Sequence, residues 1–273
     1  MKKLISNYHT HTFRCGHALD NPDEDYVLKA ISLGYKNLGF SDHAPFKGVH
    51  HPSMRMDFDK AFPDYISSIN KLKEKYKDKI NIFIGLEIEY IEDRDEYYKE
   101  LLNDYHLDYL ILGQHCIYDK EGNPHFYTQK IDDEEGFERY TRDLIKGISR
   151  GYFSYVCHPD LLLNGFQHIS PKVENLMDEI CDAANKYEVP LEININGETN
   201  NKFAAIKRCC FHYPSEIFFK KAVKHKSKLI FGVDAHAPWD FDRIDYNYFS
   251  KFLKDLNLSD NDILKELEFK KIK

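Results

Sequence analysis

Tyr8-His9-Thr10-His11-Thr12-Phe13-Arg14-Cys15-Gly16-His17 follows directly on the short apolar run Leu4-Ile5 at the start of the chain. The histidines at 9 and 11 are separated by a single residue. In an extended strand, residues i and i+2 point to the same side, so these two imidazoles can reach one metal ion. The histidine at 17, on the following loop, can reach the same ion or a neighbouring one. The stretch predicts a strand that delivers metal ligands at its C-terminal end.

Six further short apolar stretches alternate with helix-like segments along the chain. The expected strands cover 37–40, 79–86, 108–113, 153–157, 189–194 and 228–233, and the expected helices cover about 21–34, 59–77, 94–103, 133–150, 170–186 and 215–224. Short apolar strands of this kind are typical of parallel strands buried on both faces. The alternation predicts an α/β fold with a parallel barrel. An open doubly wound sheet is the alternative, but no GxGxxG fingerprint follows the first strand.

The composition is that of an ordinary globular protein, with 273 residues, of which 42% are hydrophobic and 30% charged. Without repeats or a Gly/Ser-rich linker, residues 1–273 are expected to form a single domain. The formal net charge of −7 gives no general attraction toward nucleic acid or an anionic membrane. No apolar stretch is long enough to suggest a membrane span, and residues 1–5 turn polar too soon for a signal peptide. A cytoplasmic location is expected.

The six cysteines form no CxxC pair, and in a reducing compartment they are expected to be free thiols. Cys116 directly follows one candidate ligand, His115, and Cys157 directly precedes another, His158. If these pairs lie on strands, the cysteines point away from the histidine face and pack in the core.

Polar residues stand where each expected strand ends. They are His9, His11, Asp42, His43, Glu87, His115, His158, Glu192, Asn194, Asp234 and His236. In a parallel barrel all of these strand ends converge on one face, where the loops build the active site. One histidine or carboxylate at such a place is weak evidence, since it is often structural or a helix cap. Their repetition at the same topological position predicts a metal site with more than one ion.

Imidazole and carboxylate ligands suit zinc, manganese or iron better than calcium or a thiolate cluster. The donors are too many for one coordination sphere, so two or three divalent ions are expected to share the site, with Glu87 as the natural bridge. A hydroxide held between close metal ions is a nucleophile at neutral pH, and the same ions can neutralise an attacked phosphate. Hydrolysis is therefore the expected chemistry.

An ordered set of motifs resembles the polymerase and histidinol phosphatase (PHP) superfamily. These motifs are HTHT at 9–12, RCGHA at 14–18, SDH at 41–43, GLEIEY at 85–90, LGQH at 112–115, CHPD at 157–160 and GVDAH at 232–236. Together they span nearly the whole chain. The segments 54–56 (MRM) and 213–216 (YPSE), with the overall length, look most like the histidinol-phosphate phosphatase branch.

The resemblance implies a distorted seven-stranded (β/α) barrel, similar to a TIM barrel, with three metal ions at the C-terminal ends of the strands. It implies hydrolysis of L-histidinol phosphate to L-histidinol and phosphate in histidine biosynthesis. Carried over by position, the ligand sets are His9, His11, Glu87 and Asp234 for one metal, Glu87, His115 and His158 for a second, and His17, His43 and His236 for a third.

An arginine is expected to complete the neutralisation of the phosphate, because its fork matches phosphate geometry. Arg14 in the histidine loop and Arg55 on the long polar loop at 47–55 are the candidates; for each, the alternative is a surface salt bridge. Asp160 and His43 are the candidates for protonating the leaving group, the latter only if metal does not fully occupy it.

Two features depart from the family pattern and leave the substrate open. Gln114 stands where a small or apolar residue is expected, and the segment 197–212 is loosely patterned, both at the expected pocket rim. A PHP phosphoesterase acting on phosphotyrosine protein, a nucleotide or a nucleic-acid end is the enzymatic alternative. The acidic balance favours a small phosphorylated metabolite over nucleic acid, which needs clustered Lys and Arg. A non-catalytic metal-binding module is the other alternative. The sequence fixes neither the metal identity nor the oligomeric state.

Overall fold

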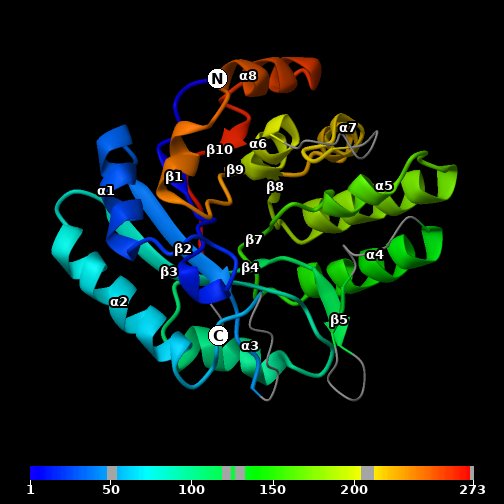
Figure 1. Ribbon diagram of the computed structural model, residues 1–273. Helices are drawn as coiled ribbons and strands as arrows, with labels where there is room; N and C mark the ends of the chain where they lie inside the picture. Colours follow the sequence, from blue (N-terminus) through cyan, green and yellow to red (C-terminus); the bar gives the residue numbers. More distant parts are fainter. Residues whose placement is uncertain (48–53, 119–123, 127–132, 204–211, 271–273) are drawn as a thin grey trace.

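The computed structural model describes residues 1–47, 54–118, 124–126, 133–203 and 212–270. Eight strands in these ranges form one curved, fully parallel sheet in the order β1-β2-β3-β4-β7-β8-β9-β10. Their bounds are β1 Ser6–Asn7, β2 Asn37–His43, β3 Asn81–Ile88, β4 Tyr109–Leu112, β7 Tyr155–Val156, β8 Leu191–Asn194, β9 Leu229–Gly232 and β10 Ile263–Leu264. The predicted α/β barrel is confirmed as a curled sheet with helices around its outside (Figure 1).

Helices follow most of the strands. They are α1 Asp23–Leu33, α2 Ala61–Tyr76, α3 Asp95–Asn103, α4 Glu134–Ser149, α5 Pro171–Lys186, α6 Ile195–Phe203, α7 Glu216–Lys224 and α8 Tyr246–Asp255, with short 3₁₀ turns η1 Phe13–Cys15, η3 Leu161–Gly165 and η4 Pro238–Asp242. In α5 the Ser170 side chain accepts a hydrogen bond from the Val173 N–H, with proline at the first helical position. In the part of the chain that the structure describes, no helix combines the length and apolarity needed to cross a bilayer.

Side-chain alternation along the strands divides the core into two clusters. On β3, Ile84, Leu86 and Ile88 belong to the large cluster between the sheet and the helices. Phe83, one residue out of phase with them, packs instead on a smaller cluster inside the barrel that contains Tyr8, Tyr109, Ile111, Tyr155, Cys157 and Ile230. Because Glu87 shares the phase of Phe83, it lies on the inner face at the C-terminal end of the same strand.

The curved sheet closes on itself at the end where the strands terminate. The residues after β1 meet the residues after β9 through a parallel bridge between Thr10 and Ala235. The His11 N–H donates to the Ala235 carbonyl at 2.8 Å, and the Ala235 N–H donates to the His9 carbonyl at 3.1 Å. This seam holds the first histidine motif beside the last one.

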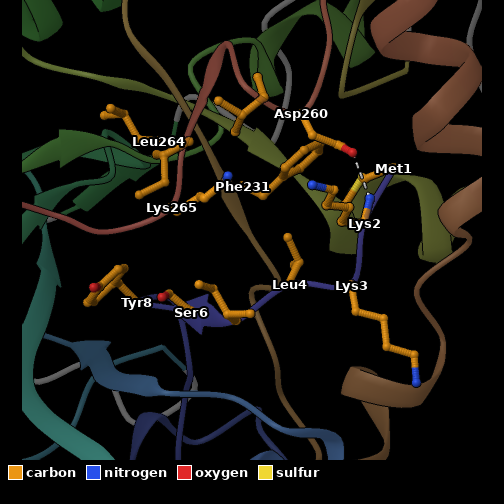
Figure 2. A pocket seen from close by; sticks show the side chains of 13 residues that line it. Met1, Lys2, Lys3, Leu4, Ser6, Tyr8, Phe231, Asp260, Leu264 and Lys265 are labelled. Atoms are coloured by element: carbon orange, nitrogen blue, oxygen red, sulfur yellow. Dashed lines mark hydrogen bonds between the residues drawn. The ribbon is translucent and has the colours of Figure 1, made fainter.

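At the opposite end the gap between β1 and β9 is occupied by the C-terminal segment. Strand β10 pairs with β9, and the Leu267 N–H donates to the Tyr8 hydroxyl at 3.3 Å. Figure 2 shows the N-terminal segment facing Phe231 and Leu264 across a cavity. The volume of this cavity is about 190 Å³. Strand β1 thus pairs with β2, but it meets the β9 side only beyond its own C-terminal end, at the bridge between Thr10 and Ala235, which is the distortion of the barrel.

The sequence did not predict β10, α8 or the antiparallel hairpin of β5 Cys116–Tyr118 and β6 Pro124–Phe126. Each is too short, or too polar on its outer side, to stand out as a periodic pattern. Helix α6 begins directly after β8, in a segment expected to be loosely patterned. Most of the long loop predicted at 47–55, and residues 204–211 of the segment at 197–212, lie outside the described residues.

Phe269→Ala is expected to lower the free energy of unfolding by about 2 kcal/mol, because it removes apolar contacts inside the barrel. The Phe269 ring stacks on the Tyr109 ring, with centroids 5.1 Å apart, and its centroid lies 4.9 Å from that of Phe83. Chemical denaturation followed by circular dichroism measures the change. Leu28→Ala, at a side chain that is 48% exposed, is the control and should change the stability by less than about 0.5 kcal/mol. Equal losses in the two variants would contradict this role of the C-terminal segment.

Candidate metal centre

Glu87 stands at the centre of the predicted site, and five histidines surround its carboxylate. Oxygen Oε1 lies 2.8 Å from His158 Nε2 and 3.3 Å from His115 Nε2. Oxygen Oε2 lies 3.2 Å from His43 Nδ1, 3.3 Å from His11 Nε2 and 3.4 Å from His9 Nε2. The two oxygens therefore face two different sets of imidazoles, which is the arrangement a bridging carboxylate requires.

Asp234 contributes a second carboxylate beside the first two histidines. Its Oδ1 lies 3.3 Å from His11 Nε2 and 3.5 Å from His9 Nε2. Asn194 and Asn196 donate their side-chain amides to Oδ2, at 3.2 and 3.3 Å. The amides hold the carboxylate with Oδ1 turned toward the two histidines.

The remaining predicted ligands gather on the side of the site that is nearer the solvent. Nε2 of His236 lies 3.0 Å from Nε2 of His17, and the His17 and His43 ring centroids are 5.1 Å apart. The His11 ring stacks on the His236 ring, with centroids 4.3 Å apart. The group near the solvent is therefore in contact with the histidines that surround Glu87 and Asp234. All nine predicted metal-ligating residues thus lie in one continuous cluster.

Charge in this cluster is strongly coupled. Against the effect of burial, Glu192, Asp234 and Glu87 raise the pKa of His9 to about 10. The histidines around it keep the pKa of Glu87 well below its usual range, although burial acts to raise it. Burial, with the neighbouring cation at His11, lowers the pKa of His236 to about 3 and that of His43 well below its usual value. The carboxylates thus raise the pKa of one group of imidazoles, whereas burial and neighbouring positive charge lower the pKa of the other.

Among the described residues, several groups of three or four side chains have potential metal-ligating atoms that lie close enough together to bind one ion. Donor atoms within 4.8 Å of one another are found in the groups His9-His11-Asp234, His43-Glu87-His115, His11-His43-His236, His11-Cys15-Asp42 and His9-Glu87-Cys157-His158. Buried imidazoles with a few carboxylates are the ligands that zinc, iron and manganese prefer. The residues fit a site for divalent ions of this class.

Two carboxylates that had no assigned role stand behind the ligands. Glu192 Oε1 lies 2.8 Å from His9 Nδ1, while its Oε2 accepts the His158 N–H at 2.9 Å. Asp42 accepts the Thr12 N–H and hydroxyl and lies 3.6 Å from His11 Nδ1. A carboxylate on one ring nitrogen turns the other toward a metal. The sequence placed both carboxylates at strand ends, but it could not show which histidine each one faces.

Two glycines allow the carboxylates to approach the backbone of neighbouring strands. A Cβ atom at Gly113 would lie 2.2 Å from Glu87 Oε1, and one at Gly232 would lie 1.7 Å from Glu192 Oε1. No larger side chain fits at these distances. This explains the glycines in the LGQH and GVDAH motifs.

Both cysteines are buried, as predicted, but the prediction that Cys157 points away from the histidines is wrong, whereas Cys116 contacts no histidine of the site among the contacts of the described residues. Cys157 Sγ lies 3.0 Å from Glu87 Oε1, and Cys116 Sγ lies 3.5 Å from Glu89 Oε1. Cys157 directly follows Val156, the last residue of β7, and its side chain lies on the same inner face of the sheet as that of Tyr155, two residues earlier. His158 then reaches the site because its backbone turns to φ 29°, which breaks the alternation.

The predicted arginines are held by carboxylates. Arg14 pairs with Asp23 at 2.9 Å and with Asp64 at 2.7 Å, beside the histidine loop. Arg55 is buried and pairs with Glu89 at 2.6 Å. The role of each in phosphate binding stays a prediction.

Asp160 and Gln114 are both buried, and each is held by backbone groups. Asp160 accepts the Ser215 N–H, and burial raises its pKa to about 7. The prediction that Gln114 lies at the pocket rim is wrong. Its side chain accepts the Tyr90 N–H at 2.9 Å and donates to the Tyr90 carbonyl at 3.2 Å, so it fastens the loops after β3 and β4 together.

Comparison with known proteins agrees with this geometry. A family model described as the PHP domain matches residues 7–196. A protein of Deinococcus radiodurans named "Probable histidinol-phosphatase" is 26% identical over 240 residues, which cover 86% of this chain and 87% of the relative. The histidinol-phosphatase of Bacillus subtilis is 25% identical over 256 residues, which cover 85% of this chain and 93% of the relative.

A solved structure has the same fold. It is the histidinol phosphate phosphatase of Lactococcus lactis subsp. lactis, in complex with zinc, L-histidinol and phosphate. The TM-score is 0.66 at 19% identity, and the match covers 94% of this chain and 95% of that one. At this identity the likeness extends to the fold alone.

Proposed function

This chain belongs to the PHP domain family, and from that premise we propose that it hydrolyses L-histidinol phosphate to L-histidinol and phosphate with the help of bound divalent metal ions. The relatives from Deinococcus radiodurans and Bacillus subtilis, which match most of its length, carry the name of this enzyme, a phosphoric monoester hydrolase. The reaction belongs to histidine biosynthesis. We further propose that residues 1–273 act as one domain.

The observation that carries the proposal is the position of Glu87 between two sets of imidazoles. One oxygen lies within 3.3 Å of His115 and His158, and the other within 3.4 Å of His9 and His11. A purely structural carboxylate would need one or two partners, whereas this one has five buried histidines around it. Such a donor set suits a carboxylate shared between cations.

The proposed ligand sets divide the cluster into three. One cation would be held by His9, His11, Glu87 and Asp234, a second by Glu87, His115 and His158, and a third by His17, His43 and His236. The distances around Glu87 and Asp234 support the first two sets directly. Zinc, manganese and iron are the proposed ions, and zinc is the ion in the structure from Lactococcus lactis.

Bound divalent cations would supply a nucleophile at neutral pH and neutralise the charge of the phosphate. The chain itself supplies orientation, because Glu192 and Asp42 fix the rings of His9 and His11 from behind. Arg14 lies within the histidine loop and is the proposed phosphate-side arginine. Of the two candidates for protonating the leaving group, Asp160 is the better supported. Burial raises its pKa to about 7, the range that suits a general acid, and its Oδ1 makes no hydrogen bond to another described residue.

Turnover of three substrates tests the proposal. The chain is loaded with zinc, manganese or iron, and phosphate release is measured with L-histidinol phosphate, a phosphotyrosine peptide and a nucleoside monophosphate. We expect kcat/KM for L-histidinol phosphate to exceed the others by at least about tenfold, since one well-made set of polar contacts discriminates by this much or more. Exhaustive dialysis against a chelator should abolish turnover, and adding the metal back should restore it.

Equal rates on the three substrates would favour the alternative, a PHP phosphoesterase with another substrate. Absence of turnover with every metal, in a folded protein that retains the metal, would overturn the hydrolase assignment. A non-catalytic metal-binding module would then remain.

A further inference from the structure

A buried ion pair lies directly behind the predicted ligand His115. Arg55 Nη2 donates to Glu89 Oε1 at 2.6 Å, and each side chain is only 1% exposed. The same oxygen lies 3.5 Å from His115 Nδ1. Removing two charges from water costs several kcal/mol, so a pair buried this deeply persists only where further contacts hold both partners.

Arg55 has such contacts on the side of β2. Its Nη1 donates to the Ala44 carbonyl at 2.9 Å, and its guanidinium lies 5.0 Å from the centroid of the Phe46 ring. Ala44 directly follows the predicted ligand His43, and its N–H donates to the Glu87 carbonyl at 2.9 Å. The guanidinium therefore ties the end of β2 to the carboxylate that follows β3.

Glu89 faces the ring nitrogen of His115 that is turned away from Glu87. The Nε2 atom of His115 lies 3.3 Å from Glu87 Oε1, whereas Nδ1 lies 3.5 Å from Glu89 Oε1 and, among the described residues, makes no hydrogen bond of its own. An imidazole that binds a cation through Nε2 must carry its proton on Nδ1, and a carboxylate there fixes both the tautomer and the ring orientation. Spacing in the sequence agrees, because Glu87 and Glu89 are two residues apart and lie on the same side of the chain.

We propose that Arg55 and Glu89 form a positioning pair, in which Arg55 holds Glu89 and Glu89 holds His115 for the cation shared with Glu87. This inference rests on the proposed metal-dependent hydrolysis. It assigns to Arg55 a role through Glu89 and not a direct contact with the substrate phosphate. The pair acts on the affinity and geometry of one metal position.

Metal retention is the measurement that tests the pair. The purified metal-loaded protein is dialysed against graded concentrations of a chelator, and the metal per chain is counted by elemental analysis. Glu89→Gln removes the charge at nearly constant volume and should lower the affinity of one equivalent about 10- to 100-fold, the range for losing such a partner. Its kcat should fall, while KM for L-histidinol phosphate stays within about twofold of wild type.

A comparison of Arg55 variants separates positioning from phosphate binding. Arg55→Met should reproduce the loss of one metal equivalent, and Arg55→Lys should restore part of it. Lys73→Met breaks the Lys73–Asp108 ion pair, 2.8 Å long and remote from the histidines, and should retain all metal. If Arg55→Met raises KM with metal retention unchanged, Arg55 binds phosphate directly and the proposal is wrong.

The double variant Arg55→Met with Glu89→Gln tests whether the pair only stabilises the fold or also positions His115. Replacing both partners removes the cost of one unpaired buried charge, so a structural pair would recover stability and metal retention together. A positioning pair recovers stability but stays deficient in one metal. Full recovery of metal retention would overturn the inference. A wild-type protein that hydrolyses none of the three substrates would refute the proposed function instead.

Discussion

Glu87→Gln is expected to lower kcat for phosphate release by at least about a thousandfold, the largest loss from any single change in this chain. The carboxylate is 1% exposed and lies among five imidazoles at 2.8 to 3.4 Å. An amide has one acceptor oxygen, so it would turn an N–H₂ group toward one of the two sets of histidines. The site would lose both a negative charge and its bridge.

The Glu87→Gln variant should also bind less metal and remain folded, because glutamine has almost the same volume. Phosphate release and elemental analysis of the dialysed protein measure the two losses. Glu74→Gln changes an exposed carboxylate on α2 in the same way and should leave both quantities at the wild-type level. A Glu87→Gln enzyme within tenfold of wild type would show that this carboxylate does not bridge cations.

Regular strands explain why so much of this site could be predicted from sequence. Polar residues that follow short apolar runs become neighbours as soon as the strands are parallel, and β2 to β4 pair in a register that aligns His43 with Glu87 and Glu87 with Ile111. The residues that form the site could therefore be predicted from the polar residues at the strand ends. This prediction required no knowledge of side-chain conformation.

Contacts that depend on irregular backbone could not be predicted. The prediction for Cys157 failed because it extended a strand through His158, where the backbone is left-handed. Asp234 has φ 53° for the same kind of turn after β9. The partners of Glu89 and Glu192 depend on which ring nitrogen faces which oxygen, and residue spacing carries no information on that.

The way in which the barrel closes could not be predicted from the sequence either. Strand β10 is two residues long, and the aromatic ring of Phe269 fills the barrel interior from a segment with no periodic pattern. Its importance lies in the contact with Tyr109, whose hydroxyl donates to the Tyr8 carbonyl at 2.7 Å, directly before His9. The C-terminal segment thus supports the strand that carries the first histidines.

His9→Ala and His17→Ala are expected to remove different metal ions, although both residues belong to one ten-residue stretch. His9 is fully buried against Glu87, Asp234 and Glu192, whereas His17 is exposed and contacts His236. Each variant should retain about one equivalent of metal fewer than wild type after dialysis. Activity should fall by at least about a hundredfold for His9→Ala, since its loss opens the position next to the bridge.

The double variant decides whether the two histidines serve one ion or two. If they serve different ions, the losses add, and the double variant retains about two equivalents fewer than wild type. If they share an ion, the double variant loses no more metal than His9→Ala alone, and the proposed division of ligands is wrong. His168→Ala, an exposed histidine outside the cluster, is the matched control and should retain all metal. The stacking of His11 on His236 at 4.3 Å makes this test necessary, because His11 lies close enough to both groups to serve either ion.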